Sequence, residues 1–300
     1  MSLPLVIGVG ELLWDLFPDR RCPGGAPANF AFHANQLGCQ GMAASRVGND
    51  ELGREIVTFL KGQGLDTGLV QTDSQFPTGQ VTVDLSRPEH PAYTIHTDVA
   101  WDHLECNDAW RAAAKSAAAI CFGTLAQRTP TSRLAIQQLL DASQAFKVFD
   151  INLRQHWYSR ETIEQGLSRA QMVKLNHEEA EQLGPLLGFG ELGLPALRDR
   201  LFSMYPLTIL CVTRAERGCW ISSRDESEID IAGEPIQLVD PVGAGDAFTA
   251  AFISGLLAKK PLRSVAQWAN RVGGYVASQP GAMPTIPAGI LRSIGFQPVV

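Results

Sequence analysis

The chain has 300 residues, of which 45% are hydrophobic and 19% charged, so it has the composition of an ordinary globular protein with a sizeable core. Its net charge of −6 and the absence of any run of Lys or Arg argue against nucleic acid or an anionic membrane as a partner. No apolar run has the length of a membrane span, and no signal peptide precedes the first apolar run. We therefore expect a cytoplasmic protein.

The six cysteines and six histidines are scattered, without C-x-x-C, H-x-H or H-E-x-x-H spacing. Dispersed cysteines of this kind are typical of reduced thiols and not of disulfides or a zinc site. Two of them, Cys211 and Cys219, are expected to fill space in the core and in a turn.

Short apolar runs alternate with longer helix-compatible stretches along the chain. The runs that predict buried strands are 5–10, 118–122, 146–149, 172–175 and 208–213. The stretches with apolar residues three and four apart, which predict helices, are 131–145, 160–170 and 177–187. This alternation predicts an α/β fold with three layers, in which helices cover both faces of a doubly wound, mostly parallel sheet. Such sheets bind ligands beyond the carboxyl ends of their strands.

Residues 78–97 interrupt this rhythm, because apolar and polar residues alternate in two pieces joined by the turn-like segment 86–91. The pattern predicts a hairpin with one polar face. With residues 12–17 the hairpin is expected to form a small β-sheet lid over the site, at about 12–20 and 78–100 of a single domain that spans 1–300. Two alternative roles remain open for Trp101 and His103, which follow the hairpin: packing, or closing on a ligand.

A lid of this kind either flaps alone or pairs with its copy in a second subunit. An isolated ribbon is marginal in water, so we favour a homodimer that buries the apolar face of Val81, Val83 and Leu85.

Residues 23–30 read Pro-Gly-Gly-Ala-Pro-Ala-Asn-Phe and predict a helix with glycines at its start. Pro27 suits the first turn and Gly38 the end of this helix. Asn29 offers a fixed donor and acceptor to a polyol and shares a face with His33 and Gln36. The alternative, a plain surface helix, explains His33 and Gln36 but leaves the paired glycines unexplained.

Residues 239–248 read Val-Asp-Pro-Val-Gly-Ala-Gly-Asp-Ala-Phe and predict a second helix of the same kind. The amides of Gly243, Ala244 and Gly245 would form an anion hole at the positive end of the helix dipole. Asp246 then stands in the first turn. A loop that only binds phosphate should lack a carboxylate there, whereas a loop that transfers a phosphoryl group to a hydroxyl needs a base. The alternative is that Asp246 merely complements the helix dipole.

Neither glycine cluster is a familiar nucleotide-binding loop. The chain has no G-x-x-x-x-G-K-[ST], and the segment 8–10 continues to Leu13 where a dinucleotide fingerprint has glycine or alanine. A P-loop kinase and a Rossmann dehydrogenase are therefore disfavoured.

With these motifs established, the chain resembles the ribokinase-like, or PfkB, sugar kinases over nearly its whole length. The segments that carry the resemblance are 10–15, 24–30, 47–53, 150–154, 174–179, 213–218 and 240–248. Ala215 stands where the family usually has glycine. The segment 10–18 is most similar to that of fructokinases, while ribokinases, 2-keto-3-deoxygluconate kinases and nucleoside kinases share the scaffold.

The resemblance implies a ribokinase-like fold and an ATP-dependent kinase that phosphorylates a primary hydroxyl of a free sugar, with fructose favoured. Asp246 would be the catalytic base, and the sugar would be held by Asp15, Gly25, Asn29 and Arg154. The nucleotide side would include Thr213, Gly218, Asn270 and Gly281. Asn176 and Glu179 would orient Mg²⁺ through water, and a monovalent cation, K⁺, is implied near Asp240. The competing class is a sugar or nucleotide sensor that has lost the chemistry, yet the base and the glycines are both present.

Overall fold

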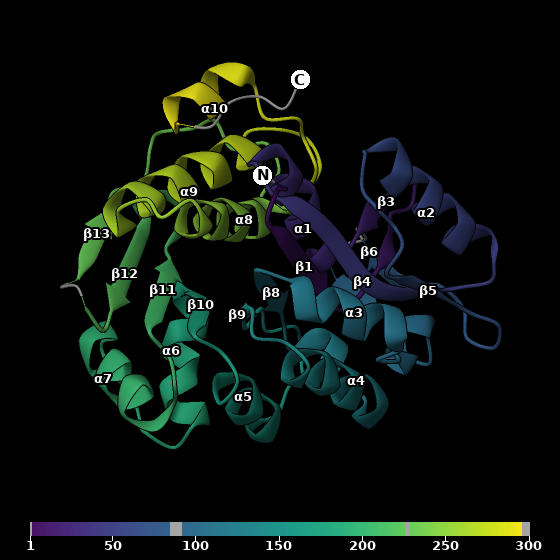
Figure 1. The fold of residues 1–300 in the computed structure, drawn as a ribbon, viewed down its shortest axis with the longest axis horizontal. Coiled ribbons are helices and arrows are strands. Elements are labelled where there is room, and N and C mark those ends of the chain that lie inside the picture. The colour runs from purple at the N-terminus through teal and green to yellow at the C-terminus, as the bar shows by residue number, and fades with distance from the viewer. Residues whose placement is uncertain (1, 85–91, 226–227, 296–300) are drawn as a thin grey trace.

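A nine-stranded sheet forms the centre of the molecule in the computed structural model, which describes residues 2–84, 92–225 and 228–295 (Figure 1). The strand order is β13-β12-β11-β10-β9-β8-β1-β4-β5. The strands are β1 (Leu5–Val9), β4 (Gln40–Gly48), β5 (Val70–Asp73), β8 (Ala119–Phe122), β9 (Phe146–Asp150), β10 (Met172–Asn176), β11 (Ile209–Thr213), β12 (Cys219–Ser223) and β13 (Ile229–Ile231). Neighbouring strands from β5 to β11 are parallel, and β12 and β13 add an antiparallel edge.

Helices cover both faces of this sheet, as the alternation of runs predicts (Figure 1). One layer contains α1 (Ala26–Gln36), α8 (Ala244–Leu257), α9 (Leu262–Ala277) and α10 (Ala288–Ser293). The other contains α3 (Asp108–Ser116), α4 (Pro130–Asp141), α5 (Arg160–Leu167), α6 (His177–Leu186) and α7 (Leu194–Met204). On β1, Val6 packs in the core with α8 while Ile7 and Val9 pack in the core with α4, because successive side chains of a strand point to opposite faces.

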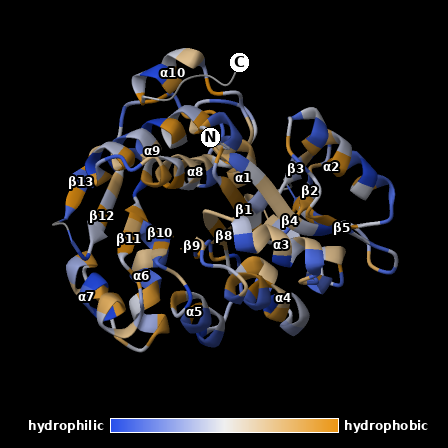
Figure 2. Cartoon of the chain, viewed as in Figure 1, coloured by the Kyte–Doolittle hydropathy of each residue, from blue (hydrophilic) through white to orange (hydrophobic). Residues whose placement is uncertain are grey.

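The five strands expected from apolar runs are all present, each within a few residues of its predicted bounds. Their side chains are hidden on both faces, so these segments need no polar side, and Figure 2 shows hydrophobic colour along the central strands. Cys211 and Cys219 are both fully buried in the core. In the ranges that the structure describes, no helix combines the length and the apolarity needed to cross a membrane.

A second, four-stranded sheet stands beside the main one. It has the order β3-β2-β6-β7 and consists of β2 (Leu13–Leu16), β3 (Arg21–Gly24), β6 (Gly79–Asp84) and β7 (Ala92–Ile95), with α2 (Glu51–Gly62) next to it. β6 and β7 pair antiparallel with Val81 opposite Ile95, so the predicted hairpin and its small sheet are confirmed. The expected turn at 86–91 and Leu85 lie outside the described residues.

The apolar face of this lid sheet is covered by its own chain. Val81 and Val83 are only 6% and 2% exposed, and Val81 packs with Trp101 of η1 (Ala100–His103), which is itself 1% exposed. The expectation that Val81 and Val83 bury themselves against a second subunit is therefore wrong, because both are already buried within one chain, Val81 against the segment that follows the hairpin. The prediction of a homodimer was based on this apolar contact, which is therefore not available to a second subunit.

Ala215 begins a tight turn, η3 (Ala215–Arg217), between β11 and β12 with a φ of +49°. The turn closes through a hydrogen bond from the Gly218 N–H to the Ala215 carbonyl at 2.9 Å. Alanine therefore keeps the turn that glycine usually makes, but in a left-handed conformation that costs a residue with a Cβ about 1–2 kcal/mol.

Ala215→Gly is expected to raise the free energy of unfolding by about 0.5–1 kcal/mol, because relief of that strain exceeds the added entropy of the unfolded chain. Equilibrium denaturation in urea measures the change. The matched control is Ala258→Gly at a φ of −77°, which should lower stability by up to about 1 kcal/mol. Equal losses in both variants would show that the turn carries no strain.

Candidate functional site

A cavity opens where the N-terminal ends of α1 and α8 meet the carboxyl ends of the central strands. Its walls come from β1, β8 and β9, from the segments that follow them, and from the two helices. The lining residues are Val9, Glu11, Ala26, Pro27, Phe30, Cys121, Phe122, Gly123, Thr124, Leu125, Asp150, Asn152, Asp246 and Thr249. This is the edge at which a parallel sheet is expected to bind ligands.

The two glycine-fronted helices bring Asn29 and Asp246 together. Asn29 Nδ2 donates a hydrogen bond to Asp246 Oδ2 at 2.8 Å. Asn29 is 4% exposed, and its Oδ1 has no hydrogen-bond partner among the described residues. One acceptor beside Asp246 is therefore left for a ligand.

Both helix starts need glycine for steric reasons. Gly25 and Gly243 precede α1 and α8 with φ values of +128° and +78°. A Cβ on Gly25 would lie 2.4 Å from the Glu11 carbonyl oxygen, and one on Gly243 would lie 2.6 Å from that of Ala282. Of the three expected anion-hole amides, that of Ala244 already donates to the Pro241 carbonyl at 3.3 Å.

The surroundings of Asp246 favour its protonated form. Burial raises the pKa of this carboxyl to about 7, and the nearby negative charge of Asp150 adds to the rise. The amide of Asn29 and the cations Lys174 and Arg154 oppose it. A carboxyl with this pKa exchanges its proton near neutral pH.

A buried ion pair lies under the start of α8. Lys174 Nζ is 2.9 Å and 3.1 Å from the two carboxylate oxygens of Asp150, and Thr249 Oγ1 donates to the same carboxylate at 3.2 Å. A Cβ on Gly245 would lie 3.0 Å from Lys174 Nζ. Sequence reasoning assigned no role to Asp150 or Lys174, although a lysine inside an otherwise apolar strand was a usable signal.

Three charged side chains gather at the lid side of the cavity: Glu11, Asp15 and Arg154. Burial raises the pKa of Asp15 to about 6, and the charge of Arg154 opposes the rise. Burial likewise raises the pKa of Glu11, which is 8% exposed, while its own backbone N–H and the Arg154 charge oppose the rise. The structure thus brings the predicted Asp15 and Arg154 together and adds Glu11, which sequence reasoning missed.

Asn176 and Glu179 form a capping box at the start of α6. Asn176 Oδ1 accepts the Glu179 N–H at 2.8 Å, and Glu179 Oε2 accepts the Asn176 N–H at 2.8 Å. Glu179 Oε1 accepts the Leu153 N–H at 2.8 Å. Each carboxylate oxygen keeps a second lone pair for a water of a hydrated cation, whereas direct coordination would displace a backbone donor. Among the residues described, no group of three or more His, Cys, Asp or Glu could hold a metal ion.

The residues expected on the nucleotide side lie around the loops beyond β11 and α9. Asp240 accepts N–H groups from Val242 at 3.0 Å and Gly281 at 3.1 Å, so it ties the two loops together. Asn270 Nδ2 donates to the Ala232 carbonyl at 3.1 Å, beside Gly218. The Thr213 hydroxyl at the end of β11 donates to the Leu175 carbonyl at 3.3 Å.

The same side carries an exposed apolar strip that sequence reasoning missed. Its members, which are 44–64% exposed, are Ile236, Leu238, Val239 and Val242. The strip leads directly into the start of α8. Apolar side chains left open beside a polar site are typical of a place for a flat, partly apolar ligand group.

The polar face of α1 is buried and not at the surface. His33 is 0% exposed, and its Nε2 lies 2.9 Å from the Ala282 carbonyl oxygen. Gln36 donates to the Pro284 carbonyl at 3.3 Å and accepts the Ile286 N–H at 2.7 Å. The surface-helix interpretation of His33 and Gln36 is therefore wrong, because the chain beyond α9 returns and covers this face.

Residues 19–289 match the pfkB family of carbohydrate kinases. The chain belongs to this family. The recognised family, the ribokinase-like fold and the class of enzyme are thereby confirmed.

Two relatives of this kinase are named as sugar kinases. A fructokinase of Vibrio alginolyticus is 29% identical over 310 residues, which cover 95% of this chain and 97% of the relative. A sugar kinase of Pyrococcus horikoshii is 28% identical over 297 residues, with 94% and 92% covered.

Solved structures agree with this placement. The P. horikoshii sugar kinase in complex with ATP has a TM-score of 0.81 at 26% identity, with 93% of this kinase and 94% of that chain covered. A fructokinase of Vibrio cholerae with fructose, ADP and potassium ion bound has a TM-score of 0.82 at 23% identity, covering 97% and 98%. An aminoimidazole riboside kinase of Salmonella enterica has a TM-score of 0.79 at 19% identity, covering 97% and 99%. The last two likenesses show the fold alone.

Asp246→Asn is expected to stabilise the folded kinase more at pH 8 than at pH 5. The folded chain favours the protonated carboxyl, since the pKa of Asp246 rises from 3.8 to about 7. The contribution of this group to stability is therefore full below pH 3.8 and is lost as the pH rises through about 7, whereas asparagine does not ionise.

Denaturant unfolding of both proteins at the two pH values measures the difference. Asp19→Asn, at a side chain 70% exposed, is the control and should show no such pH dependence. A stability difference for Asp246→Asn that is the same at both pH values would contradict the raised pKa.

Proposed function

We propose that this kinase transfers the γ-phosphoryl group of ATP to a primary hydroxyl of a free neutral sugar, with fructose as the first candidate. The observation that carries the proposal is the placement of Asp246, held by Asn29 at the open start of α8, in a cavity that Glu11 also lines.

Asp246 acts as the base in this proposal. The sugar hydroxyl becomes acidic only as its oxygen bonds to phosphorus, so a carboxylate with a pKa of about 7 suffices to take the proton. The amides of Gly243 and Gly245 at the start of α8 stabilise the charge that develops on the transferred group.

The charges around the cavity favour a neutral ligand. Three carboxyl groups, those of Glu11, Asp15 and Asp246, lie near the cation Arg154. Two further cations, Lys174 and Arg128, are each paired with another carboxylate, that of Asp150 or Asp102. A ligand with its own carboxylate or phosphate would add to this negative excess. The alternative substrate 2-keto-3-deoxygluconate, a sugar acid, is therefore disfavoured, while ribose and a nucleoside remain alternatives to fructose.

Hydrogen-bonding groups for a polyol come from both helices and the lid. Asn29 Oδ1 is a buried acceptor without a partner among the described residues, and the Asp15 carboxyl supplies further acceptor oxygens. Gly25 lets the start of α1 pack closely against the Glu11 backbone, and Arg154 is proposed to donate to the sugar. The fructokinase name of a relative at 29% identity supports fructose among the neutral sugars.

ATP is proposed to lie along the nucleotide side, with its base on the apolar strip and its phosphates at the start of α8. Thr213, Gly218, Asn270 and Gly281 border this side. The related sugar kinase of P. horikoshii binds ATP, which supports the donor.

Two cations complete the proposal. Mg²⁺ would neutralise charge on the ATP phosphates, and Asn176 and Glu179 fit its hydrated form because they offer lone pairs for water. K⁺ would sit by Asp240 on backbone carbonyls, since the Asp240 carboxylate itself already accepts two N–H groups. A fructokinase of V. cholerae that shares this fold has been solved with potassium ion bound.

The test is incubation with ATP, Mg²⁺ and a panel of fructose, ribose, a nucleoside and 2-keto-3-deoxygluconate, with release of ADP as the readout. Fructose should give the highest kcat/KM. A preference for the sugar acid would refute the neutral-ligand proposal, and no ADP with any substrate would favour a sensor.

Asp246→Asn should lower kcat by about 10²–10⁴, the usual worth of a positioned general base. Calorimetric titration should find sugar and ATP bound as in the parent, because asparagine keeps the hydrogen bond with Asn29. Turnover within a few-fold of the parent would leave Asp246 as a partner of the helix dipole only.

Asp15→Ala and Asn29→Ala should each raise the KM for sugar by about 10-fold or more, because a buried polar partner is left unpaired at roughly 1–3 kcal/mol. The KM for ATP should stay within about twofold, as both residues lie on the sugar side. Steady-state kinetics with each substrate varied in turn checks this, with Asp19→Ala as the matched exposed control. An equal effect on sugar and ATP would refute the placement.

A further inference from the structure

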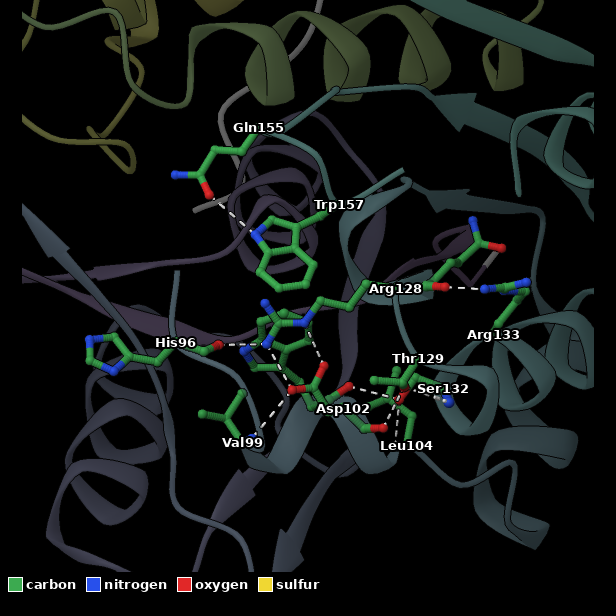
Figure 3. A network of polar contacts seen from close by, with 12 residues as sticks. His96, Val99, Asp102, Leu104, Arg128, Thr129, Ser132, Arg133, Gln155 and Trp157 are labelled. Atoms are coloured by element: carbon green, nitrogen blue, oxygen red, sulfur yellow. Dashed lines mark hydrogen bonds and ion pairs between the residues drawn. The ribbon is translucent and has the colours of Figure 1, made fainter. Parts of the chain in front are cut away.

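Arg128 lies beneath the lid between two indole rings (Figure 3). Its guanidinium carbon is 3.8 Å from the centre of the Trp101 ring and 4.7 Å from that of Trp157. Its side chain is 3% exposed. A charged group buried to this degree needs partners for its donors.

Two of the three guanidinium nitrogens have such partners. Nε and Nη2 each donate to the buried carboxylate of Asp102 at 2.7 Å, and Nη2 also donates to the His96 carbonyl at 2.6 Å. The edge formed by Nε and Nη2 is thereby used, so Nη1 points away from Asp102. Within the described residues Nη1 is buried and has no hydrogen-bond partner.

Arg128 lies next to residues that line the cavity. Arg128 directly follows η2 (Leu125–Gln127), whose Leu125 lines the cavity with Asp246. The charge of Arg128 also lowers the pKa of Glu11, another cavity residue, against the larger effect of burial.

The register of the lid sheet gives the same placement. Val81 is opposite both Asp15 and Ile95, and side chains opposite one another point to the same face. Val81 and Ile95 pack in the core with Trp101, on which Arg128 stacks, so the Asp15 side chain points to the side of the sheet on which Arg128 lies.

We propose that Arg128 binds the sugar through Nη1, which donates to one oxygen of the neutral substrate. This inference rests on the proposed function. Asp102 neutralises the charge of Arg128, so Nη1 offers a directed donor without adding net positive charge, which suits a hydroxyl or ring oxygen.

The same guanidinium fixes the lid over that sugar. Nη2 holds the His96 carbonyl just beyond β7, while Gln155 Nε2 donates to the Tyr93 carbonyl within β7 at 2.5 Å. The Trp157 indole donates to Gln155 Oε1 at 3.2 Å and stacks on Arg128 (Figure 3). One residue therefore connects the bound oxygen to the position of the outer lid strand.

The test variant is Arg128→Lys, which keeps a cation for Asp102 but lacks Nη1. The matched control is Arg133→Lys, since Arg133 also donates to a backbone carbonyl, that of Gln127 at 3.1 Å, yet does not line the cavity. Loss of a charged hydrogen bond should raise the sugar KM of Arg128→Lys by about 10- to 100-fold, with the ATP KM within about twofold. Arg133→Lys should leave both constants unchanged.

A series of deoxy sugars distinguishes direct binding of the sugar by Arg128 from a role of Arg128 in holding the lid alone. The parent should lose about 10-fold or more in kcat/KM for the one analogue that lacks the bound oxygen, and Arg128→Lys should treat that analogue and the full sugar alike. If Arg128→Lys lowers kcat/KM equally for every analogue, or matches Arg133→Lys, Arg128 only supports the lid and the proposal is wrong.

A crystal structure of the parent with its sugar decides the matter even if Arg128→Lys does not fold. Nη1 should lie within hydrogen-bond distance of a sugar oxygen, and an ordered water there in place of the sugar would overturn the proposal. If the parent prefers a sugar acid, the proposed substrate class is wrong. If the parent turns over a neutral sugar and Arg128→Lys has the same sugar KM, only the role of Arg128 is wrong.

Discussion

The hydrogen bond between Asn29 Nδ2 and Asp246 Oδ2 joins residues 217 positions apart and fixes the geometry on which the site depends. It forms only because two helices start side by side at the carboxyl edge of the sheet. Each start follows a glycine with positive φ, and at each a Cβ would overlap a backbone oxygen. Local backbone freedom at two points thus brings an acid and an amide from distant segments into contact.

Helix α1 extends this constraint to the nucleotide side. Asn29, His33 and Gln36 stand on one face and contact, in turn, Asp246, the Ala282 carbonyl and the 284–286 segment. Burial lowers the pKa of His33 to about 4, so its ring stays neutral at physiological pH and its contact with Ala282 does not change with pH. Because Ala282 also packs against Gly243, one helix face positions both Asp246 and the start of α8.

Burial affects two groups of charged side chains in the site differently. Lys174 and Asp150 are buried as a pair, and Thr249 satisfies one more lone pair, so their charges are compensated. Glu11, Asp15 and Asp246 are crowded without an ion pair of their own, so burial raises the pKa of each. The Lys174–Asp150 pair holds the strands beneath the start of α8 together. The three uncompensated carboxyls can take up and release protons closer to neutral pH.

The sequence by itself determined the five buried strands, the hairpin and the two glycine-fronted helices, because apolar periodicity and glycine φ preferences are local properties. It also placed Asp246 and Asn29 at helix starts. Only the tertiary structure decided that His33 is buried, that Lys174 pairs with Asp150, that Glu11 enters the cavity and that residues 99–104 cover Val81. These outcomes depend on which distant segments pack together, and no local pattern encodes that choice.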